Sequence, residues 1–355
     1  MMRTPPAAQV ARRRLSIASR RLGTHDPTEA IGGLLDRTFE LPCGDPRYGH
    51  NHLTPGAMPL EHSYSEVAGN ALRLDMDVLG PQASPIAKQQ EAGRTMRELV
   101  GRYYGNAALG WFDQRSEAWR GSRLDGGARF GAWFGAGFDD RGPQELKVYY
   151  ELRPGQLDAL PPNLQHAARV CMSCLPSLVP VFTSVACGRT RGSQRLYFFH
   201  DGDLRLLDLE PLMNQLGIGS RLPALLSSVG LMMGGRFVLP RGSVILGLRD
   251  TTRGFELKLD VLLSAVADPP RQLHGLIQML LAERPQAQRE LRTWMQAMTP
   301  DDAPSVGPIS AISTRVSSGS ESRLSVYFRP VGYDAPAPSE RAPDPYALQP
   351  LRAHG

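Results

Sequence analysis

One short stretch of the sequence, ELKVYYELRPG at 145–155, has polar residues spaced so that they could bind a charged ligand. Side chains of a β-strand alternate between its two faces, so one face of this segment is apolar and the other is polar. The polar face carries Lys147, Tyr149, Glu151 and Arg153. Cations gathered on a surface can neutralise an anion, and the face of a phenol ring attracts a cation. A surface strand would turn the same pattern to water, so the remaining sequence must decide what this face contacts.

The composition is that of a folded globular chain. Its 355 residues are 41% hydrophobic and 21% charged, which is enough apolar material for a sizeable core around one large closed sheet. Four cysteines are too few for a disulfide scaffold in a chain of this size. No apolar run approaches the roughly 20 residues that span a bilayer. We therefore expect a cytoplasmic protein.

The two ends of the chain are predicted to lie outside the folded domain. Residues 1–25 are basic and lack the apolar core of a signal peptide, which predicts a disordered basic tail. Five arginines of this segment, at 12–14, 20 and 21, alone match the net charge of +5, so the charge says little about the fold. We predict a single domain over residues 26–335 and a flexible C-terminal tail over residues 336–355.

Strand-like segments occur in pairs along the chain. The members of each pair are separated by turn-forming residues, as in AGN, DDRGPQ and GRTRG. The five predicted hairpins are 60–67 with 72–79, 129–138 with 145–153, 181–187 with 193–200, 243–249 with 255–263, and 309–316 with 323–329. Between them, apolar residues recur at helical spacing over 92–103, 164–178, 273–281 and 291–298.

Hairpins that alternate with helices predict a repeated architecture. A helix with one apolar stripe can cover only one face of a sheet, so the other face must be buried by closure of the sheet. The predicted fold class is therefore α/β of the α+β kind, an antiparallel ten-stranded barrel surrounded by a ring of helices. About ten strands would enclose a cavity, because barrels of about eight strands are already filled by their own side chains.

Strand parity then assigns each side chain to the helices or to the lumen. Apolar positions such as Leu146, Leu257 and Val326 face the helices. The opposite parity places charged and phenolic residues in the lumen, namely Glu61, Arg73, Lys147, Tyr149, Arg195, Tyr197, Lys258, Arg323 and Tyr327. The polar face of the 145–155 segment is therefore predicted to look into a cavity.

These segments resemble the dimethylallyltryptophan synthase family of indole prenyltransferases. The run MPLEHSYSEVAGNALRLDMDVLGP is similar to the start of that family's barrel, where an acidic residue followed by Ser precedes an Arg-led strand that ends near Gly-Pro. The segments GAGFDDRGPQELKVYYELRPG, RLYFFHDGD, FELKLDVLL and SRLSVYFRPVGYD resemble its later strands in the same order. The likeness covers roughly residues 55 to 335 and rests on this collinear order. It implies the ABBA-type prenyltransferase barrel, in agreement with the repeat.

The resemblance also implies roles for individual residues. Glu61 matches the acid that holds the proton of the indole nitrogen. The diphosphate would be bound by Arg73, Lys147, Arg195 and Lys258, with Arg195 at a position where the family usually has Lys. The allyl cation would be screened by Tyr149, Tyr197 and Tyr327. The acceptor pocket is predicted to include Trp133 and Glu151.

The implied reaction is the transfer of a dimethylallyl group from dimethylallyl diphosphate to an indole by electrophilic aromatic substitution. The acceptor would be tryptophan, a tryptophan-containing cyclic dipeptide or another indole, as in the biosynthesis of alkaloids and other secondary metabolites. The sequence has no DDxxD pattern for magnesium, so basic side chains would neutralise the diphosphate and no metal or other cofactor is expected. We expect a monomer or a homodimer.

Two alternatives stay open at this point. The same barrel could alkylate a phenolic acceptor, or it could be a non-enzymatic basic barrel that binds nucleotides or nucleic acid. Tight binding of nucleic acid at low salt, without allyl transfer, would favour the second alternative. The leading prediction has neither nucleic acid nor a membrane as a partner.

Overall fold

The computed structural model describes residues 6–120, 127–153, 155–331 and 333. Ten antiparallel strands close into a barrel in the order β1-β12-β11-β10-β9-β6-β5-β4-β3-β2. They are β1 (Leu60–Ser65), β2 (Leu72–Met76), β3 (Ala132–Asp139), β4 (Gly142–Glu151), β5 (Leu178–Gly188), β6 (Gly192–His200), β9 (Val244–Thr251), β10 (Gly254–Leu262), β11 (Ile309–Ser317) and β12 (Ser320–Phe328). The predicted fold class is confirmed, and each predicted hairpin is a pair of neighbouring strands.

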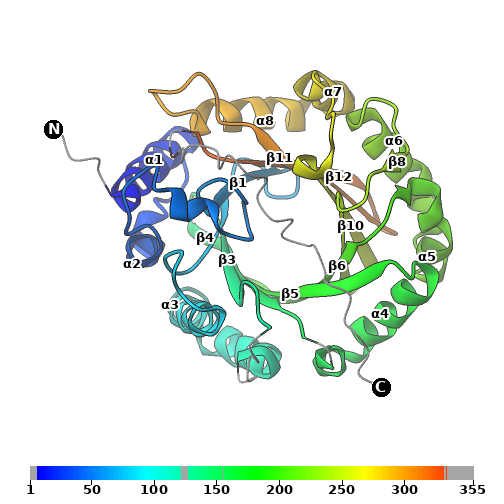
Figure 1. The fold of residues 1–355 in the computed structure, drawn as a ribbon, viewed down its shortest axis with the longest axis horizontal. Helices are drawn as coiled ribbons and strands as arrows, with labels where there is room; N and C mark the ends of the chain where they lie inside the picture. The colour runs from blue at the N-terminus through cyan, green and yellow to red at the C-terminus, as the bar shows by residue number, and fades with distance from the viewer. Residues whose placement is uncertain (1–5, 121–126, 154, 332, 334–355) are drawn as a thin grey trace.

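Helices form a ring outside the strands, as Figure 1 shows. They are α1 (Ala7–Leu22), α2 (Thr28–Thr38), α3 (Pro85–Arg120), α4 (Pro162–Cys174), α5 (Glu210–Gln215), α6 (Leu222–Met232), α7 (Leu273–Leu280) and α8 (Pro285–Met298). A short separate sheet pairs β7 (Leu204–Arg205) with β8 (Val238–Leu239). Helix α3 is interrupted at Gly105, whose φ of 82° is readily adopted only by glycine.

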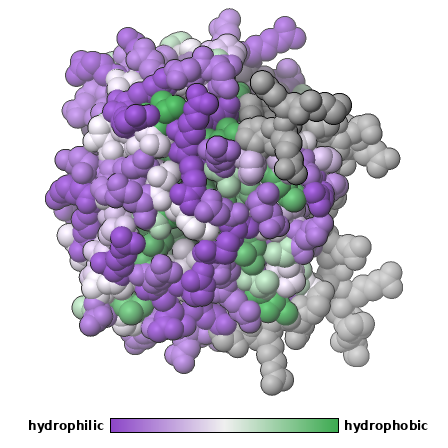
Figure 2. Space-filling model, turned by 90° about the vertical axis from the view of Figure 1, so that its left-hand side faces the viewer, coloured by the Kyte–Doolittle hydropathy of each residue, from purple (hydrophilic) through white to green (hydrophobic). Residues whose placement is uncertain are grey.

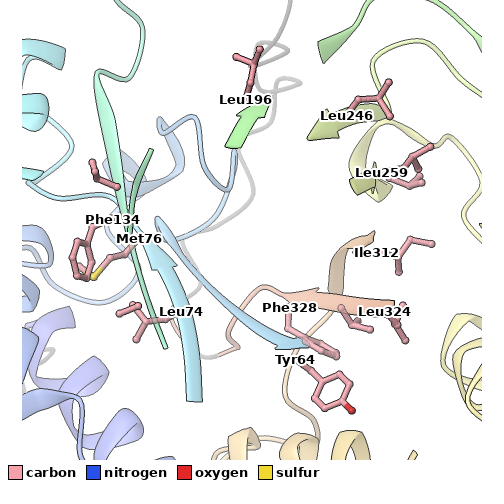
Figure 3. Packing of buried hydrophobic residues seen from close by; sticks show 14 of the residues in the cluster. Tyr64, Leu74, Met76, Phe134, Leu196, Leu246, Leu259, Ile312, Leu324 and Phe328 are labelled. Carbon is pink, nitrogen blue, oxygen red and sulfur yellow. The ribbon is translucent and has the colours of Figure 1, made fainter. Parts of the chain in front are cut away.

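The apolar core lies between the barrel and the helices. Figure 3 shows side chains such as Leu74, Phe134, Leu259 and Phe328 on the outer side of the strands. All four are at most 1% exposed, as expected for the strand face that packs on helices. Because this outer layer supplies the core, the inner faces of the strands are free to carry polar side chains.

The expectation of a disordered tail over residues 1–25 is wrong for most of that segment. Residues Ala7–Leu22 form α1, which packs against α2 and α8. Ala7, Ala11 and Leu15 are buried, whereas Arg12 on another face of the helix pairs with Asp36. Small apolar residues at four-residue spacing were the helical signal, and the excess of arginine obscured it. The predicted C-terminal tail, 336–355, lies outside the described residues.

The surface shown in Figure 2 is mostly hydrophilic, with apolar residues in small separate groups. None of the helices in the described part of the chain combines the length and the hydropathy needed to cross a membrane. The visible surface thus agrees with helices that carry one apolar stripe each and turn it toward the barrel.

Candidate active site

Two cavities lined by inward-facing strand residues lie in the described part of the barrel, and Tyr197 lines both. The first, which we call the aromatic pocket, is lined by aromatic rings together with Glu61 and Asp75. The second, which we call the cationic pocket, is lined mainly by arginines and has a volume of about 350 Å³, within the range of small-molecule sites. The parity argument is confirmed for the residues that line one cavity or the other, which are Glu61, Arg73, Lys147, Tyr149, Arg195, Tyr197, Lys258 and Tyr327.

One residue of the parity prediction lies elsewhere. Arg323 is near the start of β12, and its side chain is more than a third exposed. Its guanidinium lies 3.8 Å from Glu321 and 4.0 Å from Glu66. It has the correct parity but lies in the first part of the strand, outside the part that faces a cavity. Parity alone does not say how far along a strand the lumen extends.

Glu61 lies on β1 with its carboxylate in the aromatic pocket. Burial raises its pKa to about 8 despite a hydrogen bond donated by the Ser310 hydroxyl, and the charge of Asp75 adds to the shift. Asp75 is the cross-strand partner of Glu61 on β2. Arg73 does not pair with Glu61 but with Glu145, at 3.6 Å. A carboxyl group with this pKa can change its protonation state near neutral pH.

Aromatic faces surround the aromatic pocket. The rings of Phe182 and Tyr197 stack with their centroids 4.4 Å apart, and the ring of Tyr149 lies 6.0 Å from that of Tyr197. Trp133 also lines the pocket and stacks on Phe130 at 3.8 Å. Such faces attract a cation without offering it a strong nucleophile. Phe182 was missed in the sequence, although its strand was predicted, because an apolar residue gave no reason to place it in a polar lumen.

The cationic pocket gathers far more positive than negative side chains. Its described lining includes eight cations, Arg73, Arg141, Lys147, Arg189, Arg191, Arg195, Arg249 and Arg315, against the single carboxylate Glu145. Burial alone would raise the pKa of Glu145, yet Lys147 and Arg73 lower it to about 2. The positive field therefore outweighs desolvation, and the pocket is suited to an anion.

Arg195, Arg249 and Arg315 converge on one buried carboxylate. Arg195 and Arg249 donate hydrogen bonds to Glu256, and Arg315 lies 3.4 Å from it. Burial lowers the pKa of Arg315, and the neighbouring Arg195 lowers it further. One carboxylate does not offset three guanidinium groups, so positive charge remains for a ligand. Sequence reasoning missed Arg249 and Arg315, although both lie at the end of a predicted strand.

Lys258 lies on the aromatic side of the lumen. Its ammonium group donates a hydrogen bond to the Tyr327 hydroxyl at 2.8 Å and pairs with Asp260 at 2.7 Å. It also lies 5.0 Å from the centroid of the Tyr327 ring and 5.9 Å from that of Tyr197. Burial would raise the pKa of Tyr197, but Arg195 and Lys258 lower it. Cations from both pockets thus act on the same ring.

Glu151 does not face either cavity. Its buried carboxylate accepts hydrogen bonds from the backbone N–H groups of Arg129, Phe130 and Gly131, at 2.8 to 3.0 Å. It therefore holds the segment that leads to Phe130 and Trp133. Its predicted place in the acceptor pocket is wrong, because the strand ends at Glu151 and its alternation no longer applies there.

Asp75 is the other important residue that sequence reasoning missed. It follows Arg73 in the run RLDM of β2, at the same parity, so the signal was present. The residue is 6% exposed, and its carboxylate accepts a hydrogen bond from the Tyr149 hydroxyl at 3.1 Å and lies 3.9 Å from the Lys147 ammonium. It therefore connects the aromatic pocket with a cation of the cationic pocket.

No family model matches the sequence, and no curated protein is detectably similar to it. Solved structures are similar in fold. The ternary complex of the prenyltransferase PriB with L-tryptophan and dimethylallyl thiolodiphosphate has a TM-score of 0.70 and 16% identity, covering 96% of this chain and 100% of that one. A 6-dimethylallyltryptophan synthase from Micromonospora olivasterospora, in complex with DMASPP and Trp, has a TM-score of 0.70 and 16% identity. The match covers 94% of this chain and 100% of that one.

A third structure, the 5-dimethylallyltryptophan synthase from Streptomyces coelicolor, has a TM-score of 0.63 and 15% identity, covering 96% of this chain and 100% of that one. These likenesses extend over nearly the whole of each chain. The protein therefore has the prenyltransferase barrel fold of the dimethylallyltryptophan synthases.

Proposed function

We propose that this protein transfers a dimethylallyl group from dimethylallyl diphosphate to an indole. The observation that carries the proposal is that a cationic pocket and an aromatic pocket with a carboxylate share the wall residue Tyr197. Ionisation of an allylic diphosphate produces an anion and a cation together. Each of the two pockets suits one of these ions, and their common wall keeps the ions adjacent.

On the donor side, lysines and arginines would stabilise the departing diphosphate. Hydrogen bonds that involve a charged group contribute about 1.5 to 3 kcal/mol each, so three or four of them favour departure by several kcal/mol. Arg73, Lys147 and Arg195 are the predicted residues in this pocket, and Arg249 and Arg315 extend the set. Lys258 would stabilise the diphosphate from the neighbouring aromatic pocket, where it lies next to Tyr327.

On the acceptor side, Glu61 would accept the hydrogen bond of the indole N–H. A carboxylate strengthens the attack as electron density leaves the ring, because it stabilises the growing positive charge of the N–H group. The structures of PriB and of the Micromonospora enzyme with tryptophan support an indole rather than a phenol. Arg329 also lines the aromatic pocket, so an acceptor that carries a carboxylate belongs among the candidates.

The nucleic-acid alternative has less support. Eight of the cations line a cavity of the closed barrel, which a double helix cannot enter. On α1, Arg12, Arg14 and Arg21 pair with acidic residues. Binding to a polyanion requires accessible positive charge. The location in the cytoplasm and the state as monomer or homodimer stay predictions.

We also propose that the chemistry needs no metal, because the cations of the lumen can neutralise the diphosphate. Turnover should survive incubation with a chelator with at most a modest loss. A complete loss that magnesium restores would contradict this part of the proposal while leaving the transfer reaction itself intact.

The test of the proposed function is incubation with dimethylallyl diphosphate and a panel of acceptors, read by mass spectrometry. The panel pairs indoles with and without a carboxylate, such as tryptophan and tryptamine, and adds phenols of similar size. A mass increase of one dimethylallyl unit on an indole is the expected result. Products from phenols alone would favour the phenolic alternative, and the absence of any product would overturn the proposal.

A further inference from the structure

A second carboxylate, Asp75, lies beside Glu61 in the aromatic pocket. The two residues are directly opposite each other on β1 and β2, and both line the cavity. Opposite side chains on neighbouring antiparallel strands have Cβ atoms about 4.5 to 5.5 Å apart. That separation is of the order of the size of an indole ring, so the two carboxylates could reach different atoms of one acceptor.

The protein makes room for the Asp75 carboxylate in particular. Gly135 on β3 is its cross-strand neighbour, and a Cβ atom at that position would lie 2.2 Å from Asp75 Oδ1. Any other residue at 135 would displace the carboxylate. Glycine therefore preserves the position of an acid that the apolar packing of the fold does not need.

A cation and a hydrogen-bond donor lie next to the Asp75 carboxylate. The Lys147 ammonium lies 3.9 Å away, and the Tyr149 hydroxyl donates a hydrogen bond to it. Arg73 and Tyr327 are close enough to interact with it electrostatically, and Glu61 is the carboxyl that opposes its charge. Burial and the charge of Asp75 push Glu61 toward the protonated form.

When a ring carbon attacks the allyl cation, the protein must interact with two protons of the acceptor. One is the N–H proton, for which a single carboxylate is sufficient. The other is the proton on the attacked carbon, which must leave before the ring is aromatic again. One carboxylate cannot hold the N–H group and collect the carbon-bound proton at the same moment. Asp75 is the carboxylate that lies directly opposite Glu61, whereas the third carboxylate of the pocket, Asp260, pairs with Lys258.

We propose that Asp75 is the base that takes the proton from the attacked ring carbon of the acceptor, while Glu61 holds the N–H group. The inference rests on the proposed function. The allylic C–O bond breaks and its electron pair leaves with the diphosphate. The ring forms the new C–C bond, the C–H electron pair returns to the ring, and the proton goes to the Asp75 carboxylate and from there to solvent. The acceptor is then alkylated at carbon and not at nitrogen.

The first test uses the wild-type protein and an indole deuterated at its ring carbons. Alkylation at one of these carbons removes one deuteron, so the product should be one mass unit lighter than addition with full retention would give. Retention of every deuteron would mean attack by nitrogen and would overturn this inference, although the proposed function would stand. Absence of product would instead contradict the proposed function.

The second test is Asp75→Asn. The amide keeps the size of the side chain and an oxygen that can accept from Tyr149, so the melting temperature should be nearly unchanged. Loss of a general base typically lowers the rate by roughly 10² to 10⁴, and we expect kcat to fall within that range. Loss of the base should also make removal of the ring proton rate-limiting. The ring-deuterated acceptor should then show a primary isotope effect on kcat, measured at saturating substrate, that is larger than in the wild type.

Asp260→Asn is the matched comparison, because it removes another carboxylate of the same pocket. Asp260 pairs with Lys258, so this variant should change donor affinity without enlarging the isotope effect. An unchanged isotope effect in Asp75→Asn would overturn the inference, since the proton would then leave by another route, such as the released diphosphate. A near-normal kcat in a folded Asp75→Asn protein would overturn it as well.

Discussion

The two pockets of the lumen share a wall but differ in how they treat charge. In the cationic pocket, arginines outnumber carboxylates, and the pKa of Glu145 falls to about 2 although burial opposes the change. In the aromatic pocket, burial dominates, and the pKa of Glu61 rises to about 8. The same type of residue is thus shifted in opposite directions within one barrel. The difference shows that surroundings and not residue type decide what each acid can do.

A reaction that separates charge needs both environments next to each other. An anion is stabilised by fixed cations, and a cation by ring faces that do not react with it. A closed barrel also limits the access of water, which would otherwise trap the cation and weaken every charge interaction. Tyr197, with Arg195 and Lys258 close to its ring, lies where the two environments meet.

The largest expected effect on the acceptor side comes from removing the charge of Glu61 in the aromatic pocket. Glu61→Gln keeps the size of the side chain and much of its hydrogen bonding but removes the charge that supports the indole N–H group. The prenylation rate should fall by roughly 10² to 10⁴. Calorimetry should show that affinity for the diphosphate donor changes little, because the cations that hold it lie mainly in the other pocket.

The melting temperature of the same preparation serves as the control. A structural role for Glu61 would lower the melting temperature and leave a near-normal rate per folded molecule. That result would contradict the catalytic assignment and with it the division of tasks between the pockets.

Removal of a cation should affect the binding and ionisation of the donor, which we assign mainly to the cationic pocket. Lys147→Ala and Lys258→Ala each delete one charge-assisted contact, so donor binding and ionisation together should weaken by on the order of ten- to a hundredfold. Calorimetry with dimethylallyl thiolodiphosphate measures the binding part, and single-turnover kinetics measures the chemical part.

Arg236→Ala is a suitable control for these variants, because Arg236 pairs with Asp268 at the exposed surface. It should leave donor affinity unchanged. Unchanged affinity in both lysine variants as well would show that the lumen does not bind the donor.

The pH profile should report the raised pKa of Glu61. If the ionised carboxylate is the active form, kcat/KM should be about tenfold lower at pH 7 than on its plateau, which begins about one unit above the pKa of about 8. Only about a tenth of the carboxyl groups are ionised one unit below that pKa. In Glu61→Gln this acidic limb should disappear. A wild-type profile that is flat from pH 6 to pH 9 would argue against the role of the carboxylate.

The same shift has a consequence for stability. The folded-state pKa of Glu61 is about 8, against an ordinary value of 4.5, so the folded protein keeps a proton that the unfolded chain has already lost. The contribution of this group to stability is therefore fully present below pH 4.5 and is lost as the pH rises to about 8. Chemical denaturation of the wild type and Glu61→Gln across this range should show a smaller decline for the variant.

Much of the fold could be predicted because the barrel repeats one simple pattern. Alternation over segments such as 145–153 fixes which side chains face inward, and closure follows from helices that cover one face only. Helix α1 was missed since its buried face consists mainly of alanines such as Ala7 and Ala11, which give a weak apolar signal beside many arginines.

The positions of the site residues were predictable where a strand is regular. They were not predictable at the end of a strand, or where contacts with residues of other segments determine what a side chain does. Glu61 and Lys147 follow from parity, but Glu151 is turned away by the backbone N–H groups of a neighbouring segment. Asp75 had the correct parity, yet its position and its role depend on the hydrogen bond from Tyr149 and on the space left by Gly135. Such relations join residues that are far apart in the sequence, and alternation within one strand does not contain them.

The smallest expected effect comes from removing the hydroxyl of Tyr327. The ring of this residue lines the aromatic pocket, and its hydroxyl accepts a hydrogen bond from Lys258. Tyr327→Phe keeps the ring face and removes only the hydroxyl, while Lys258 retains its pairing with Asp260. A net loss of about 0.5 to 1.5 kcal/mol corresponds to a two- to tenfold lower kcat/KM for the donor. Tyr327→Leu also removes the ring and should cost more, because a ring face contributes about 0.5 to 2 kcal/mol to the stabilisation of a cation. Steady-state kinetics on both variants makes the comparison. If Tyr327→Phe lost as much activity as Tyr327→Leu, the hydroxyl and its link to Lys258 would be the important feature, and the aromatic pocket would depend on its polar groups rather than on its ring faces.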